Sequence, residues 1–132
     1  IRIALAEEVR QLEGSQRLRD RARNVLAEPP RSTGRTLFEA LCAGGAQALG
    51  RDAGRIAVGR WADLVTLDLA APTLAGLAGD RLLDAWLLAG DDRLVREVWS
   101  AGRSLVADGR HPLREPVARR FAEAVGPLRS AL

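Results

Sequence analysis

The hydrophobic and polar positions of this chain first follow a helical period. From residue 3 to about residue 27 the apolar side chains approximate a 3.6-residue repeat. Gly14-Ser15 interrupts the repeat, so a kink is expected there, and Pro29-Pro30 ends it because proline cannot continue a helix. The apolar residues of this stretch are Leu5, Val9, Leu12, Leu18, Ala22, Val25 and Leu26. The pattern therefore predicts one helix, or two joined helices, before residue 30.

A second helix is predicted between residues 32 and 50. Ser32 or Thr33 offers an N-cap oxygen, and Gly50 is suited to the C-terminal cap. Gly44-Gly45 lies inside the helix, where each glycine costs about 1 kcal/mol relative to alanine. We therefore expect another backbone to approach the helix closely at this pair. The apolar face consists of Leu37, Phe38, Leu41, Cys42, Ala46 and Leu49.

The later part of the chain alternates between strand and helix patterns. Residues 62–68 read as a strand whose ends Asp63 and Asp68 cap, with Leu64, Val65 and Leu67 largely buried. A short helix is predicted near residues 80–89, and two β-rich runs flanking Ala101-Gly102-Arg103 predict a hairpin. Pro116 opens a C-terminal helix to about Leu132, which Gly126-Pro127 should bend or end.

Three strands make a minimal sheet, yet helical segments separate them. The turns at Gly54-Arg55 and Gly59-Arg60 introduce a strand with few partners nearby. The chain also opens on Ile1, without methionine, directly in a predicted helix. We therefore expect a segment of a longer protein whose other part supplies the remaining strands.

Composition narrows the class of protein. All 20 basic residues are arginine, so the pI of 10.7 reflects the absence of lysine more than the net charge of +3. Such a small surplus does not indicate a nucleic-acid binder, and no apolar run approaches the roughly 18 residues of a membrane span. Cys42 is the only cysteine. No intrachain disulfide can therefore form, which is typical of a reducing cytoplasm.

Candidate catalytic and metal-binding groups are few. His111 is the only histidine and precedes a proline, and there is no H-x-H, H-E-x-x-H, CxxC or G-x-S-x-G motif. We interpret His111 as a solvated or capping residue and Cys42 as a buried structural thiol. Asp91-Asp92 follows a glycine in a predicted turn, where aspartate binds its own backbone more often than a metal. The residues alone predict no catalytic or metal site.

An arginine-rich run and the glycines near residue 54 are the other candidates. In QRLRDRARN, helical spacing places Arg17 with Arg21 and Arg19 with Arg23, and Asp20 three residues from Arg17 and Arg23. This distribution favours a solvated or interface face over a phosphate-binding stripe. The glycines at 50, 54 and 59 match neither phosphate-binding loop pattern.

One stretch carries a specific resemblance. Gly54-Arg55-Ile56, Gly59-Arg60, Ala62-Asp63-Leu64-Val65 and Leu67-Asp68 resemble the G-x-I-x-x-G-x-x-A-D-L-V-x-x-D signature of the amidohydrolase superfamily. VREVWSAGRSLVADGRH resembles the hairpin that follows it there. QRLRDRARNVL, GRTLFEALCAGGAQALGR and GDRLLDAWLLAGDDRLVREVWSAGR are most similar to the formimidoylglutamate deiminase family, enzymes of histidine degradation.

The resemblance implies an α/β fold: the C-terminal part of a (β/α)8 barrel plus strands of a small β-sandwich shared by both ends of the protein. Residues 1–53 would hold the last barrel helices, 54–110 the sandwich strands and hairpin, and 111–132 the C-terminal helix. It also implies hydrolysis of N-formimino-L-glutamate with one divalent metal, most often zinc. Metal ligands and catalytic residues would lie upstream of Ile1, so none is assigned here.

The same resemblance implies a substrate with two carboxylates and a cytoplasmic homo-oligomer, as a dimer. Two alternatives stay open. The chain could come from another amidohydrolase, such as a nucleobase aminohydrolase or an imidazolonepropionase-like ring hydrolase. It could also be a non-catalytic dimerisation or interaction module that uses its arginine-bearing helix.

Overall fold

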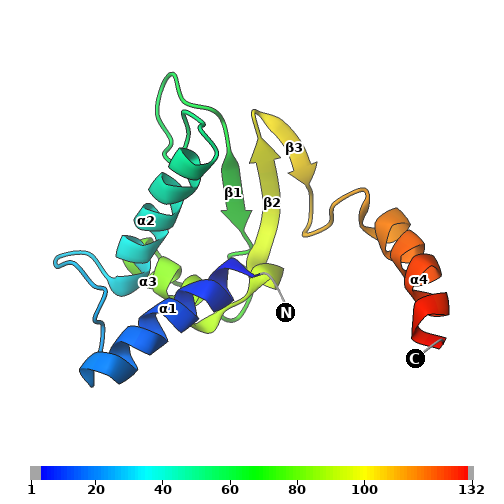
Figure 1. Cartoon of the computed structure of the whole chain (residues 1–132). Helices are drawn as coiled ribbons and strands as arrows, with labels where there is room; N and C mark the ends of the chain where they lie inside the picture. The colour runs from blue at the N-terminus through cyan, green and yellow to red at the C-terminus, as the bar shows by residue number, and fades with distance from the viewer. Residues whose placement is uncertain (1–3, 131–132) are drawn as a thin grey trace.

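The computed structural model describes residues 4–130. Its elements are, in chain order, α1 (Leu5–Asp20), α2 (Thr33–Ala48), β1 (Leu64–Leu67), α3 (Gly79–Asp84), the π-helical turn η1 (Ala85–Ala89), the 3-10 turn η2 (Asp92–Leu94), β2 (Val95–Ser100), β3 (Arg103–Val106) and α4 (Arg114–Ser130). Helices α1, α2 and α3 gather on one side of the sheet, and α4 stands apart beyond β3 (Figure 1). The predicted strand, short helix, hairpin and C-terminal helix are therefore all present.

The three strands form one antiparallel sheet in the order β1-β2-β3. Asp63, just before β1, accepts a hydrogen bond from the backbone N–H of Ala101 at 2.8 Å and so joins the strand to the hairpin turn. Asp68, just after β1, accepts one from the N–H of Ala70 at 3.1 Å. Both aspartates cap the strand ends, as predicted.

Burial of β1 differs from the prediction. Val65 is 49% exposed, and Leu64 and Leu67 are only half-buried. Leu67 packs against the core cluster, whereas Val65 lies in a row with Val98 and Val106 across the sheet. No layer of described residues fully buries that row. The predicted burial is against the sandwich core and the barrel of a longer protein, so for that protein it stays a prediction.

The core lies between the helices and the start of β2. Its buried members are Val9, Leu37, Leu74, Leu83, Trp86, Leu87 and Leu94. Phe38 packs against Trp86 in a tilted arrangement with ring centroids 5.9 Å apart. The core thus joins α1 and α2 to the short helical segment before β2. The predicted division at residues 53/54 stays a prediction.

Helix α1 is shorter than its apolar pattern predicts. It runs without interruption through Gly14-Ser15 and ends at Asp20, because Arg21 adopts a left-handed conformation (φ 50°) that cannot continue the helix. The buried carboxylate of Glu13 then accepts the backbone N–H groups of Val25 and Leu26, each at 3.1 Å. These two bonds hold the following segment as a loop, so the predicted helix to residue 27 is wrong. The uninterrupted α1 also shows that no junction between two helices lies at Gly14-Ser15, whereas the kink there stays a prediction.

Helix α2 confirms its predicted caps but not its predicted close contact. The Ser32 hydroxyl accepts a hydrogen bond from the N–H of Arg35 at 3.1 Å, and Gly50 has the positive φ of a terminating residue. At Gly44 and Gly45, however, no described atom lies within 4 Å of where a Cβ would be. The close approach expected there is therefore absent from the described part of the chain.

Helix α4 begins two residues before the predicted Pro116 and has no buried residue. It continues through Gly126 and Pro127 to Ser130, so the helix does not end at this pair. Proline removes one N–H donor, and on an exposed helix water can bind the carbonyl that loses its partner. The start of the first predicted helix at residue 3 and the end of the last at Leu132 lie outside the described residues.

Candidate functional site

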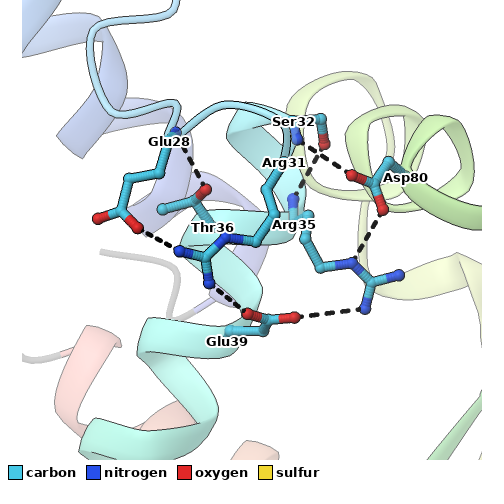
Figure 2. A network of polar contacts seen from close by, with 7 residues as sticks. All are labelled: Glu28, Arg31, Ser32, Arg35, Thr36, Glu39 and Asp80. Carbon is cyan, nitrogen blue, oxygen red and sulfur yellow. Dashed lines mark hydrogen bonds and ion pairs between the residues drawn. The ribbon is translucent and has the colours of Figure 1, made fainter.

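The densest polar cluster in the described chain joins the start of α2 to α3. Asp80 accepts the backbone N–H of Ser32 at 3.0 Å and the Nε–H of Arg35 at 2.9 Å. Asp84, one turn later on α3, accepts the Ser32 hydroxyl at 2.8 Å and the N–H of Gly34 at 2.7 Å. Figure 2 shows Asp80 facing Ser32 and Arg35. The first turn of α2 is therefore capped by carboxylates from another helix.

Gly34 permits this contact by having no side chain. A Cβ at Gly34 would lie 2.5 Å from Asp84 Oδ1 and 2.8 and 2.9 Å from the Asp84 backbone N and Cα. All three separations are below ordinary contact distance, and two of them involve backbone. The helices can therefore approach this closely only with glycine at this position.

Each carboxylate of the cluster accepts hydrogen bonds from a guanidinium group, a hydroxyl or a backbone N–H. Two carboxylates at the N-terminus of α2 complement the positive end of its helix dipole. The backbone N–H of Ser32, with the Arg35 guanidinium, lowers the pKa of Asp80 below its ordinary value. Farther out, Glu39 accepts Arg31 at 2.9 Å, and Arg31 also pairs with Glu28. The arrangement suits helix docking and leaves no charge directed toward a ligand.

Replacing Asp80 with Asn is expected to lower the melting temperature at neutral pH. It should also make the melting temperature fall less steeply as the pH is lowered. Because the native pKa is lowered, the carboxylate stabilises the fold above its unfolded-state pKa, and this contribution disappears as pH falls through the lower native value. Melting temperatures of the full-length protein between about pH 3 and 7 measure the effect. The difference between wild type and variant should shrink toward acid. Glu123→Gln on exposed α4 is the control, and a difference independent of pH would contradict the assignment.

Two further polar side chains position the helices. Arg10 of α1 donates to the carbonyls of Gly90 at 2.7 Å and Leu87 at 3.3 Å, closing the end of η1. Glu13, 3% exposed, holds the loop after α1. Sequence reasoning missed these groups and the Asp80–Asp84 pair. One sequence signal could have indicated the contact between these helices. The two aspartates are four residues apart, so they share one face of a helix, and a Ser-Thr-Gly helix start offers donors for them.

The sequence-predicted candidates take structural roles. Nδ1 of His111 accepts the N–H of Leu113 at 3.1 Å just before α4, which confirms the capping interpretation. Asp91 accepts the N–H of Arg93 at 2.9 Å and pairs with its guanidinium, as expected of a turn aspartate. Cys42 is half-buried, not buried as predicted, and its pKa is raised mainly by this partial burial and secondly by the charge of Glu39. A raised pKa disfavours the reactive thiolate.

The arginine-rich run lies only partly on a helix. Arg17, Arg19, Arg21 and Arg23 are exposed, consistent with a solvated face. Arg21 and Arg23 follow the end of α1, so the expected helical pairing of Arg17 with Arg21 and of Arg19 with Arg23 is wrong. Asp20 pairs instead with its neighbour Arg19 at 2.6 Å, which lowers the pKa of Asp20.

Within residues 4–130 no three His, Cys, Asp or Glu side chains gather as a possible metal site. No buried polar side-chain atom of this part lacks a hydrogen-bond partner, so none is directed at an absent ion. No helix among these residues is both long and apolar enough to cross a membrane. The described residues therefore do not fit a metal centre.

An apolar groove of about 460 Å³ lies between α1 and α2. Its lining residues are Glu8, Val9, Leu12, Leu37, Ala40, Leu41, Gly44 and Gly45. The two glycines that meet no described atom thus form part of its open wall. Only one of the eight residues is charged, so this groove suits apolar side chains and lacks the polar groups of a substrate pocket.

Comparison with known proteins gives a consistent result. The family model described as "Amidohydrolase family" matches residues 10–105. The formimidoylglutamate deiminase of Pseudomonas aeruginosa is 52% identical over 129 residues, which are 97% of this chain and 28% of that protein. The chain therefore spans less than a third of the length of this relative.

Two solved structures have the same fold over nearly the whole chain. An amidohydrolase from Brucella melitensis matches with a TM-score of 0.82 and 44% identity, covering 94% of this chain and 27% of that one. An adenosine deaminase from Xanthomonas campestris, solved with bound zinc, matches with a TM-score of 0.77 and 24% identity, covering 96% and 28%. At 24% identity the second structure shows the shared fold alone.

Proposed function

The chain belongs to the amidohydrolase family, and we propose that it is the C-terminal segment of a deiminase acting on N-formimino-L-glutamate. Water adds to the formimino carbon, and the bond from that carbon to the terminal nitrogen breaks. The products are N-formyl-L-glutamate and ammonia, as in histidine degradation. The observation that carries the proposal is the 52% identity to a formimidoylglutamate deiminase over 97% of this chain.

The residues of this chain act as scaffold in the proposed enzyme. Its aspartates and arginines bind one another and helix ends, and the described residues do not fit a metal site. We place the catalytic residues and one divalent metal, zinc, on the part of the polypeptide upstream of this chain. No step of the reaction is assigned to the residues described here.

The identity to a deiminase over 97% of the chain supports an enzyme segment over a free-standing interaction module. Large apolar side chains are exposed on α1, β1, β3 and α4, and Ile56 and Val58 before β1 are almost completely open to solvent. Exposed apolar side chains often mark surfaces that contact other protein. This surface favours a segment that packs against more protein. We also propose that the full-length enzyme forms a homodimer.

Turnover of alternative substrates by the full-length, metal-loaded protein tests the function. Ammonia release from N-formimino-L-glutamate should exceed that from guanine, cytosine or adenosine by about 100-fold or more at equal concentration. We propose that arginines in the upstream part of the enzyme pair with the two carboxylates of N-formimino-L-glutamate. The nucleobases and the nucleoside lack these carboxylates, so such arginines would be left unpaired. Faster turnover of guanine, cytosine or adenosine would instead indicate another amidohydrolase.

A further inference from the structure

The groove between α1 and α2 has walls that stay exposed to solvent in the described chain. Leu12 is 49% exposed, and Ala40, Gly44 and Gly45 are exposed on the facing helix. Leu37 and Leu41 form the floor, where the core begins. The groove is therefore an extension of the hydrophobic core that no described residue covers.

The glycines of α2 strengthen this conclusion. Glycine in a helix interior is unfavourable because it loses the most backbone freedom on folding. At Gly34 that loss is compensated by the contact with Asp84, whose atoms occupy the place of a side chain. At Gly44 and Gly45 the same place is empty in the described chain. The compensation must come from atoms that approach this face from elsewhere.

We propose that apolar side chains from the upstream part of the same polypeptide fill this groove. The inference rests on the proposed function, which makes this chain one segment of a longer enzyme. Relatives are more than three times as long as the chain, so ample polypeptide exists outside it. Eight lining residues fall short of the roughly 20 to 30 per side of a stable interface between separate proteins. A covalently linked segment needs no such area, because its effective concentration is high.

Thiol accessibility in the full-length protein tests this proposal without any substrate. Ala40→Cys places a thiol in the groove wall, and Ala43→Cys, at another exposed alanine of the same helix outside the groove, is the matched control. We expect N-ethylmaleimide to modify the Ala40→Cys thiol about 100-fold more slowly than the Ala43→Cys thiol, because the groove must open first. Both variants carry Cys42→Ser, because residues 40, 42 and 43 lie in one tryptic peptide and the native thiol would otherwise react beside them.

The proposal is overturned if the two thiols react at similar rates. It is also overturned if protection of Ala40→Cys increases with protein concentration, since that would identify a second copy as the occupant. Gly44→Leu supplies an independent measurement. It should lower the melting temperature of the full-length protein by several degrees, whereas Gly126→Leu, at an exposed helical glycine of α4 outside the groove, should not. Equal melting temperatures for these two variants would contradict the proposal, whatever substrate the enzyme turns over.

Discussion

Replacing Gly34 with valine is expected to destabilise the full-length protein by about 3 to 4 kcal/mol, combining overpacking with broken hydrogen bonds. The new Cβ would lie 2.8 and 2.9 Å from the backbone N and Cα of Asp84, so a simple side-chain rotation cannot relieve the clash. Separating α2 from α3 would then stretch the bonds from Ser32 and Gly34 to Asp84, now 2.8 and 2.7 Å. Buried donors and acceptors would lose their partners.

The melting temperature of the full-length protein measures this effect. Ala43→Val is the matched control, because it adds the same branched side chain to an exposed position of the same helix. It should change stability by about 0.5 kcal/mol, the range of ordinary surface substitutions. If Gly34→Val melts at the same temperature as Ala43→Val, the close α2–α3 contact is wrong.

Leu87→Ala is expected to destabilise the protein by about 3 to 4 kcal/mol. Leu87 has no exposed surface and packs in the cluster with Val9, Leu74 and Trp86. Truncation removes buried methyl groups and leaves a cavity that its neighbours fill only in part. The Arg10 bonds to the carbonyls of Leu87 and Gly90 also fix the backbone here, which limits relaxation.

Thermal unfolding compares Leu87→Ala with Leu18→Ala, a leucine of α1 that is 83% exposed. The exposed leucine should tolerate truncation with a change of about 0.5 kcal/mol or less. A Leu87→Ala protein as stable as Leu18→Ala would show that η1 does not belong to the core.

Elements with local signals could be predicted from the sequence. Ser32 and Gly50 mark the ends of α2 because caps depend on side chains a few residues away. The strand with Asp63 and Asp68, and the hairpin around Gly102, likewise follow from short patterns. The family signature is local in the same way, so the amidohydrolase membership could be inferred without a single catalytic residue.

Features set by long-range contacts could not be predicted. The apolar period continues past Asp20, but Glu13 captures two backbone N–H groups of the next segment and holds it outside a helix. Asp80 and Asp84 lie 48 and 52 residues along the chain from Ser32, at the start of the helix that they cap. Val65 is half-exposed and the face of α2 at Gly44 is open among the described residues, although the sequence predicts burial and close contact there.

The identity of the bond that is broken tests the proposed function most directly. The formimino carbon of N-formimino-L-glutamate carries two C–N bonds, and hydrolysis of each gives different products. The full-length, metal-loaded protein should release ammonia and N-formyl-L-glutamate in equal amounts, with the formyl oxygen derived from labelled water. Release of L-glutamate and formamide, or no turnover of this substrate, would contradict the proposal.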